Sequence, residues 1–451
     1  VEYQIDGSFA PMLLEAWEVN EDATEYVLNV RPGVTWSNGD SFTSEDVAFN
    51  IARWCDTGVE GNSMASRMGS LVDTETGQAR DGAITVVDDT TVRLLLVQPD
   101  ITLIAGFSDY PAAIVHQSYN GDPQDNPIGT GHYLPEVIEV DMKAVLVKNE
   151  SHRWWGEGAY LDRIEYLDFG TEQAGIVAAV DADEVDMVYE SIGEFILLMD
   201  SFGWSKSEAL TANTVVIRAN QEAEVDGVKP YADARVRRAL AMAVDNRVLL
   251  ELGFSIFGLG SEIHHVSPIH PLYADQPPVV YDPEGAWALM EEAGMGDFEH
   301  DLISIDDTWR KNTTDAAAAM VRDAGIPVKR TVLPGSTFWN DWAKYPLSTT
   351  DWAQRPLGVQ VLALAYRSGE PWNESAFSNA EFDALLEEAL AIADADKRRT
   401  VMAKLQQIMR DEGVVIQPYW RSIYRRHKEN VVGAEMHPTF EIHVSKLGFA
   451  A

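Results

Sequence analysis

Residues 230–245 read PYADARVRRALAMAVD and carry a strong helix pattern. Asp233 is expected to cap this helix, because a carboxylate at that position accepts the free backbone N–H groups of the first turn. Val236, Leu240 and Val244 recur at every fourth position and form one apolar stripe. Since the chain on either side reads as a separate α/β unit, we predict that this helix lies at the crossing between two lobes.

The same stretch resembles the PF-D-x-R-V-R-x-A-L-x-x-A-I-D signature of the dipeptide, oligopeptide and nickel solute-binding proteins of bacterial ABC importers (solute-binding protein family 5, cluster C). Two further segments resemble that family in the right order. Residues 14–47 run from LEAWEV to RPGVTWSNGDSFTSEDV, and residues 129–164 contain GTGHY, KNE and YLDRI. The resemblance implies an α/β, two-lobe fold like that of type II periplasmic binding proteins, with an extra α+β subdomain in lobe one.

The resemblance also implies how the chain is divided. We expect residues 1–128 to form the extra subdomain, residues 129–220 and 431–451 the core of lobe one, and residues 221–430 lobe two. The family has further strands ahead of the point that corresponds to Val1, so we expect N-terminal strands of lobe one to be missing before residue 1.

Local patterns predict the individual elements. Thr43 and Asp46 fit a capping box that opens a helix ending near Cys55. A strand, a helix and a strand follow one another between residues 164 and 189, which is the βαβ pattern. Other strands are expected at 24–31, 213–219, 301–305, 328–333, 414–420 and 440–447, hairpins at 84–96 and 137–148, and helices at 282–293, 313–324, 381–393 and 396–412.

Composition narrows the function. The 451 residues include 34 Lys and Arg against 72 Asp and Glu, a formal charge of −38 that disfavours nucleic acid as a partner. The single cysteine, Cys55, allows no disulfide within the chain. No apolar run is long enough to span a bilayer.

Ligands of open α/β sheets bind beyond the carboxyl ends of strands, and aromatic side chains there supply large, flat contact areas. Four loops qualify. They contain Tyr189 after the strand at 185–189, Asp306 and Trp309 after 301–305, Trp339 within 334–346, and a last group within 349–356. The ligand-binding residues that we predict are Tyr189, Asp306, Trp309, Trp339, Asp351, Trp352 and Arg355.

The last of these loops resembles the family segment W-x-x-D-x-x-D-P, whose acid receives the α-amino group of a bound peptide. Arg355 stands before Pro356 where that acid is expected, and Asp351 lies one position before Trp352. A guanidinium there favours a carboxylate or a phosphate through a bidentate pair. The alternative is that Arg355 pairs with one of the many acids of the surface. If Arg355 holds ligand, Arg355→Ala should weaken binding at least tenfold.

His264, His265 and His270 form the densest histidine cluster. Adjacent histidines do not share a helix face and no acid lies at a familiar metal spacing, so we expect neither a metal nor another cofactor.

The function that these observations favour is that of an extracytoplasmic, periplasmic solute-binding protein of an ABC importer, acting as a monomer. It would capture a peptide or peptide-like solute by lobe closure and deliver it to a membrane permease, without enzymatic activity. The alternatives are binding of an anionic non-peptide solute, such as an opine, a sugar acid or an oligosaccharide, and a chemosensory receptor. A glycoside or peptide hydrolase is the alternative of another class. Against it, Asp306 and Asp307 are sequence neighbours that do not face each other across a cleft.

Overall fold

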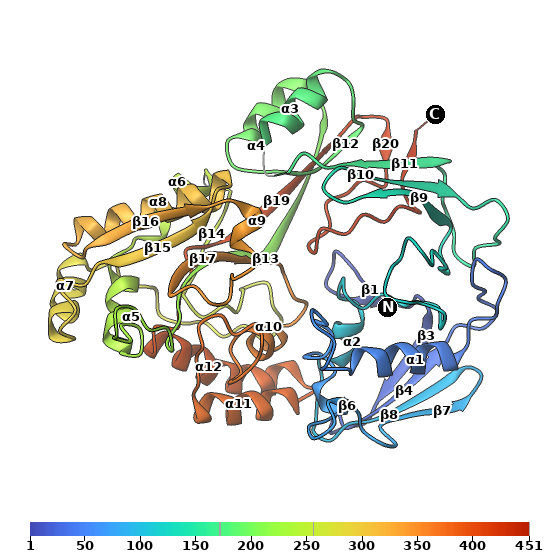
Figure 1. The fold of residues 1–451 in the computed structure, drawn as a ribbon, viewed down its shortest axis with the longest axis horizontal. Coiled ribbons are helices and arrows are strands. Elements are labelled where there is room, and N and C mark those ends of the chain that lie inside the picture. The colour runs from blue at the N-terminus through green and yellow to red at the C-terminus, as the bar shows by residue number, and fades with distance from the viewer. Residues whose placement is uncertain (171–172, 256, 451) are drawn as a thin grey trace.

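The computed structural model describes residues 1–170, 173–255 and 257–450. Three bodies surround two long strands (Figure 1). Lobe one holds β9 to β12 with α3 and α4, lobe two holds β14 to β17 with α5 to α12, and a small subdomain holds β3 to β8 with α1. This arrangement confirms the predicted two-lobe α/β fold with an extra α+β subdomain.

The two lobes are joined by β13 (Ser205–Ala219) and β19 (Tyr419–His427). The first half of β13 pairs with β19, and its second half pairs with β17 (Leu347–Trp352) in lobe two. The register of β13 against β19 shifts between Leu210 and Thr214, where the strand passes from one lobe to the other. This eight-stranded sheet has the order β12-β19-β13-β17-β15-β16, with β14 paired to β19 and β18 to β13.

The predicted crossing helix lies elsewhere. Asp233 does cap α5 (Ala234–Met242), accepting from the backbone N–H of Arg235, but α5 packs against α7 (Pro283–Glu292) within lobe two. The helix ends because Asp245 caps a second one, α6 (Asn246–Phe254). The prediction that this helix crosses between lobes is therefore wrong. Its apolar stripe indicates that one face of the helix is buried, but it does not indicate which sheet that face packs against.

The secondary structure of the subdomain agrees closely with the local sequence patterns. Thr43 and Asp46 form the predicted capping box at the start of α1 (Ser44–Trp54). The helix covers a four-stranded sheet of order β3-β4-β8-β7, formed by Leu14–Val19, Glu25–Val30, Thr91–Leu95 and Ile84–Asp88. Trp36 and Cys55 are fully buried in its core, so the cysteine serves as packing. A side chain as large as Trp36 contributes roughly 2–3 kcal/mol when it is removed from water.

Lobe one corrects the βαβ prediction. The hairpin of β9 (Tyr133–Glu139) and β10 (Lys143–Lys148) is confirmed, and β11 (Arg163–Leu167) adds to it antiparallel. Helix α3 (Gln173–Asp181) and β12 (Met187–Ser191) follow, but β12 pairs antiparallel with β19 in the central sheet. The strands before and after the helix thus belong to different sheets. A local pattern of strand, helix and strand cannot distinguish these pairings, because the partner of β12 lies more than 200 residues away. The predicted helix start at residues 171–172 lies outside the described residues.

In lobe two, β15 (His300–Ile305) and β16 (Val328–Leu333) pair in parallel and join β17. Helix α8 (Thr308–Asp323) begins five residues earlier than predicted, because Asp307 caps it by accepting from the N–H groups of Arg310 and Lys311. Residues 349–352, predicted as a loop, belong to β17. The other helices are α9 (Gly335–Phe338), α10 (Gly358–Ala365), α11 (Ala380–Leu390) and α12 (Ala395–Asp411).

The C-terminal segment returns to lobe one, as predicted, but residues 440–447 do not form a strand. Phe440 has φ +65, a backbone conformation that interrupts extended structure. The return is made instead by β20 (Val431–Val432) pairing with β21 (Gly448–Phe449).

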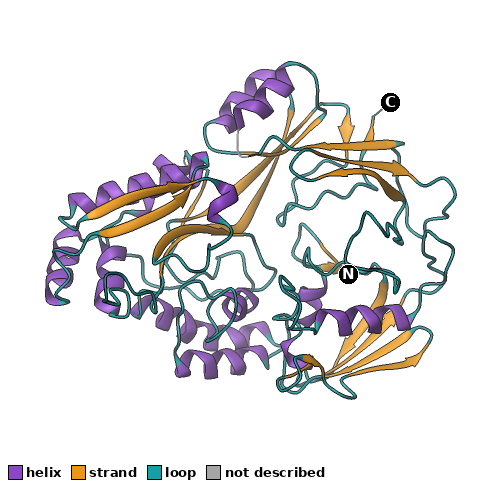
Figure 2. Cartoon of the chain, in the orientation of Figure 1, coloured by secondary structure: helices purple, strands orange, loops and turns teal. Residues whose placement is uncertain are grey.

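The helices gather around the sheet of lobe two, whereas the region around β9 to β11 consists of strands and loops (Figure 2). Within the described ranges no helix is both long enough and apolar enough to cross a membrane. The remaining short elements are β1 (Glu2–Tyr3), β2 (Phe9–Ala10), β5 (Val72–Asp73), β6 (Gln78–Ala79), α2 (Leu103–Phe107), α4 (Phe195–Leu198), β14 (Gly258–Gly260), β18 (Val415–Ile416) and the 3-10 turns Gly69–Leu71 and Met199–Phe202.

Candidate functional site

Five charged side chains converge where β12, β19, α8 and β17 meet. Glu190 comes from β12 of lobe one and Arg421 from the shared strand β19. Asp307 and Arg310 come from the start of α8, and Asp351 from β17 of lobe two. We call these five residues the junction cluster. It brings charged groups from both lobes to one place, which is what a ligand held between lobes requires.

The cluster consists of two linked sets of ion pairs. Arg421 Nη1 lies 3.0 Å from Glu190 Oε1. Arg310 bridges two acids, with its Nε 2.5 Å from Asp307 Oδ2 and its Nη1 paired with Asp351 Oδ1. Because Arg310 holds both aspartates, neither is free to act as a general acid or base.

Aromatic rings hold the two guanidinium groups in place. The carbon at the centre of the Arg421 guanidinium lies 4.2 Å from the ring centre of Trp309, and that of Arg310 lies 5.2 Å from the same ring. Arg310 also lies 5.4 Å from the ring centre of Trp339. Stacking of this kind fixes the orientation of an arginine and leaves the edge of its guanidinium available.

Burial sets the electrostatics. Burial raises the pKa of Glu190, against the opposing effect of Arg421. Burial likewise raises the pKa of Asp307, which Arg310 opposes. For Arg310 burial disfavours the charged form, but Asp351 and Asp307 outweigh it and raise its pKa. Arg310 therefore stays charged, while burial makes the charge of Glu190 sensitive to a nearby ligand charge.

The cluster is incomplete as a hydrogen-bonding network. Among the described residues Arg421 Nε is buried and has no hydrogen-bond partner. A buried donor without a partner costs about 1–3 kcal/mol, which a ligand acceptor would recover. Beside the cluster two large rings stay open to solvent, Tyr189 at 55% exposure and Trp339 at 42%. Tyr189 stacks on Phe440 with ring centres 5.6 Å apart.

The structure thus brings four of the predicted residues together: Tyr189, Trp309, Trp339 and Asp351. Asp306 is exposed and stands beside the cluster residue Asp307 in the sequence. The residues predicted from the sequence do not include Glu190, Asp307, Arg310 or Arg421. Glu190 and Asp307 could have been found, because each follows a predicted strand by one or two residues. Arg310 and Arg421 lie in a helix and a strand, where only tertiary contacts show their role.

Trp352 points to the opposite face of β17 from Asp351. It is 4% exposed, and its Nε1 donates to Glu374 Oε1 at 2.8 Å. Glu374 also pairs with Arg218, whose Nε lies 2.9 Å away. Trp352 is therefore part of a buried network inside lobe two, and its predicted contact with ligand stays a prediction.

Arg355 lies in a second contact, between lobe two and the subdomain. Its Nε is 3.3 Å from Asp109 Oδ2, which also receives Arg67 Nε at 2.8 Å. Burial opposes the ionisation of Asp109, but Arg355 and Arg67 outweigh it and lower its pKa. Arg67 also lies 5.3 Å from the ring centre of Trp372 in lobe two. Arg355 therefore pairs with an acid, which was the second of the two alternatives. That acid belongs to the subdomain and not to lobe two.

The histidines at 264–270 find protein partners. His265 Nδ1 lies 2.6 Å from the Tyr366 hydroxyl, and His270 Nε2 donates to the Arg355 carbonyl at 3.0 Å. Burial lowers the pKa of His265 to about 3, so its ring is neutral. These contacts explain the three histidines as buried polar residues in the segment of the chain between β14 and α10.

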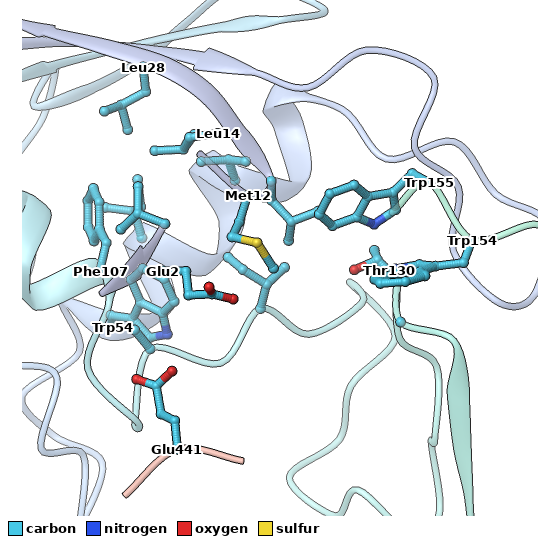
Figure 3. A pocket seen from close by; sticks show the side chains of 17 residues that line it. Glu2, Met12, Leu14, Leu28, Trp54, Phe107, Thr130, Trp154, Trp155 and Glu441 are labelled. Atoms are coloured by element: carbon cyan, nitrogen blue, oxygen red, sulfur yellow. The ribbon is translucent and has the colours of Figure 1, made fainter. Parts of the chain in front are cut away.

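A separate cavity of about 420 Å³ lies between the subdomain and lobe one (Figure 3). Its walls are apolar, with Leu14, Leu28, Trp54 and Phe107 on one side, and the carboxylates of Glu2 and Glu441 enter it. All of its lining residues come from positions 1–155 and from Glu441. A ligand in this cavity would not contact lobe two, so it would not drive the lobes together.

Comparison with known proteins identifies relatives of the whole chain. The model of bacterial extracellular solute-binding proteins, family 5, matches residues 8–374. The chain is 23% identical to heme-binding protein A of Haemophilus influenzae, over 89% of this chain and 77% of that relative. It is also 23% identical to the dipeptide-binding protein of Escherichia coli, over 98% of this chain and 87% of the relative.

Solved structures share the fold. The oligopeptide-binding protein AppA of Bacillus subtilis, in complex with a nonapeptide, superimposes with a TM-score of 0.85 at 18% identity, covering 100% of this chain and 92% of that one. The binding protein AgaA of A. tumefacien R10, in complex with agropinic acid, gives the same TM-score at 21% identity and the same coverage.

Proposed function

Because the chain belongs to the bacterial extracellular solute-binding proteins of family 5, we propose that the junction cluster is the place where it holds its solute. The observation that carries this proposal is the convergence of Glu190 from lobe one with Arg310 and Asp351 from lobe two, beside the buried free donor of Arg421. The subdomain cavity of Figure 3 lacks this property.

Closure follows from the same geometry. A solute that contacts Glu190 or Arg421 on one side and the Asp351 and Trp339 face on the other gains both sets of contacts only when the lobes are together. Its differential affinity for that state shifts the population toward closure. We assign the pivot of lobe closure to the register shift of β13 between Leu210 and Thr214. We also assign lobes one and two to the residue ranges that are expected from the sequence.

The solute that fits best is a peptide or peptide-like zwitterion. Arg421 Nε can donate to a carboxylate, and Glu190 and Asp351 can accept hydrogen bonds from an ammonium group. Tyr189 and Trp339 would cover the apolar parts of the solute. Relatives whose names specify dipeptide binding, and the peptide seated in AppA, agree with this class.

An anionic non-peptide solute is the second candidate. The two stacked guanidinium groups of Arg310 and Arg421, and Arg355 in place of an acid, favour carboxylate or phosphate groups. The complex of AgaA with agropinic acid shows that this fold accepts such a ligand. The presence of three carboxylates in the cluster argues for the zwitterion instead.

The protein would act outside the cytoplasm, in line with the relatives that are named as periplasmic. It would present its closed, loaded form to the permease of an ABC importer. No bond is broken in this scheme. Asp307 and Asp351 both pair with Arg310, and Glu190 pairs with Arg421, so the junction cluster offers no opposed pair of free carboxylates of the kind that glycoside hydrolysis requires.

The test begins with native mass spectrometry of protein secreted by its host, to identify a retained small molecule. Calorimetry then compares a tripeptide with its N-acetylated and C-amidated forms. If a zwitterion is the solute, both modifications should weaken binding at least tenfold, and no cleaved product should accumulate. Tight binding of the amidated peptide, or turnover, would contradict the proposal.

Variants connect this result to the cluster. Glu190→Gln should weaken binding of the free peptide but leave that of the N-acetylated peptide unchanged, because the acetylated form has no ammonium group to lose. Asp323→Asn is the control, since Asp323 is an exposed acid at the far end of α8 and its variant should bind as the natural chain does. Equal losses in both variants would place the solute elsewhere.

A further inference from the structure

A group of metal-ligating side chains lies outside the junction cluster, in the C-terminal segment that returns to lobe one. His437, Glu441 and His443 each offer one ligand atom, and these atoms lie within 4.8 Å of one another. The rings of the two histidines have centres 5.3 Å apart. We propose that these three residues form a binding site for a divalent transition metal of the Zn²⁺ type.

The hydrogen bonds of His437 favour this role. Its Nε2 lies 2.9 Å from the Tyr3 carbonyl oxygen, and a carbonyl can only accept, so Nε2 carries the proton. The lone pair therefore lies on Nδ1, which receives the Thr439 hydroxyl at 2.8 Å and the Thr439 backbone N–H at 3.2 Å, two donors whose place a metal ion would take. Histidines that ligate metals commonly donate their other ring N–H to a backbone carbonyl in this way. The ring is also 2% exposed, so burial fixes its position.

The other two ligands complete one side of a coordination sphere. Glu441 Oε2 and His443 Nε2 lie 3.0 Å apart and share a hydrogen bond, which a tetrahedral zinc ion would replace by holding the two atoms about 3.4 Å apart. Glu2 Oε2 lies 3.7 Å from His443 Nε2, at the edge of this group of three. Two imidazoles and carboxylates suit Zn²⁺, Ni²⁺ or Cu²⁺, whereas Mg²⁺ and Ca²⁺ prefer oxygen ligands alone.

The site has an entry path. A pocket of about 360 Å³ opens beside it, lined by Asp6, Glu435 and the three ligands. Its acids would attract a cation, as would the formal charge of −38 on the whole chain. One group opposes this attraction. Lys446 Nζ lies 3.0 Å from His443 Nδ1 and 3.2 Å from Glu2 Oε1, where its charge competes with a metal ion.

A metal ion here would fasten the C-terminal segment to β1. That segment also places the Pro438 carbonyl 3.0 Å from Asn213 Nδ2, at the register shift of β13, and the Phe440 ring on Tyr189. The ion would therefore hold in place a loop that contacts both the crossing strand and an exposed ring of the candidate site.

The experiment uses the full chain without a histidine tag, treated with chelator and dialysed. Zn²⁺ should bind with micromolar affinity or tighter by calorimetry and raise the Tm, because a ligand of the folded state stabilises it by mass action. Co²⁺ should give the visible absorption of a four- or five-coordinate site, and Mg²⁺ should do neither. Absence of both the Zn²⁺ stabilisation and the Co²⁺ band would overturn the proposal.

Variants separate this site from adventitious binding. His443→Gln and Glu441→Gln should each weaken Zn²⁺ binding at least tenfold. His437→Gln should do the same, and because His437 is buried, the more exposed His443 provides the test if that variant does not fold. His116→Gln is the control, since His116 Nε2 lies 3.2 Å from Asp40 in the subdomain and outside the site. Equal affinities in His443→Gln and His116→Gln would overturn the assignment.

Lys446→Gln gives the sharpest test. Removing its charge should tighten Zn²⁺ binding at least threefold, an effect that a merely structural histidine cluster would not produce. Unchanged or weaker affinity in this variant would contradict the geometry that we infer.

Discussion

The two faces of β17 carry similar residue types arranged for different purposes. On one face Trp352, Glu374 and Arg218 form a closed network, in which Glu374 receives Thr350, Trp352 and Arg218 at 2.8, 2.8 and 2.9 Å. The side chains of Arg218 and Glu374 are 0% and 4% exposed. On the other face Asp351 and Arg310 are 25% and 15% exposed.

The two faces of β17 differ in whether a buried hydrogen-bond donor lacks a partner within the protein. Arg218 also donates from its two Nη atoms to the carbonyls of Tyr345 and Trp342, so each of its three nitrogens has a partner within the protein. In the junction cluster Arg421 keeps a buried Nε without a partner among the described residues. A finished network stabilises the fold, whereas an unfinished one between two lobes can be completed by a solute.

The largest effect is expected on the finished network. Glu374→Ala leaves Arg218 charged and unpaired in the core, which should lower the free energy of unfolding by about 3–5 kcal/mol in urea denaturation. Solute affinity of the folded fraction should change less than twofold. The double variant Arg218→Met with Glu374→Leu should recover much of the loss, because it removes the buried charge. A loss below about 1 kcal/mol in Glu374→Ala would show that the network does not hold lobe two together.

The next effect is expected on the unfinished network. Arg421→Lys keeps the charge but removes the Nε donor and the flat stacking on Trp309, so solute affinity should fall about thirtyfold by calorimetry, or about 2 kcal/mol. The unfolding free energy should change by less than about 1 kcal/mol. Arg247→Lys serves as control, since its side chain is 89% exposed beside Asp245. If the stability loss exceeded the affinity loss, the two faces of β17 would not differ as we propose.

Arg355 tests whether contact between the bodies matters in addition to contact with solute. Arg355→Ala removes the ion pair to Asp109 and should weaken solute binding about tenfold by making closure less favourable, which corresponds to about 1.4 kcal/mol. Asp109→Asn should weaken binding by a similar factor, although Asp109 lies outside the junction cluster. X-ray scattering of the free variants should show a larger radius of gyration than that of the natural chain.

A different result would separate the two roles that the sequence left open for Arg355. If Arg355→Ala weakened binding and Asp109→Asn did not, the guanidinium would contact solute directly. Unchanged affinity in both variants would exclude Arg355 from binding altogether.

Much of the local structure could be predicted because its causes are local. Thr43 and Asp46 cap α1 from within four residues, and Asp282 with Gly294 bounds α7. The pairing of strands that lie far apart in the sequence could not be predicted from such local patterns. The partner of β12 is β19, and the link between lobes is β13, whose predicted range at 213–219 covered only its second half.

The residues of the candidate site also fall into those with a local sequence signal and those whose role depends on long-range contacts. The sequence predicts Tyr189 and Asp351 as ligand-binding residues because acids and aromatic rings at strand ends follow a positional rule, and both lie at or beside the junction cluster. Asp306 was selected and its neighbour Asp307 was not, because the start of α8 was placed five residues late. Arg421 sits in the middle of a buried strand, and only the approach of Glu190 and Trp309 distinguishes it from a structural arginine.

The smallest effect is expected at the exposed edge of the junction cluster. Tyr189→Ala removes a ring that stacks on Phe440 with 55% of its own surface in water, so solute affinity should fall about threefold to fivefold, in the range of an aromatic contact. Trp352→Phe, on the closed face, should leave affinity within twofold and lower the Tm instead, because it removes the donor to Glu374. Calorimetry and thermal unfolding of the two variants should therefore give opposite patterns. If both variants lost affinity alike, ligand would reach both faces of β17.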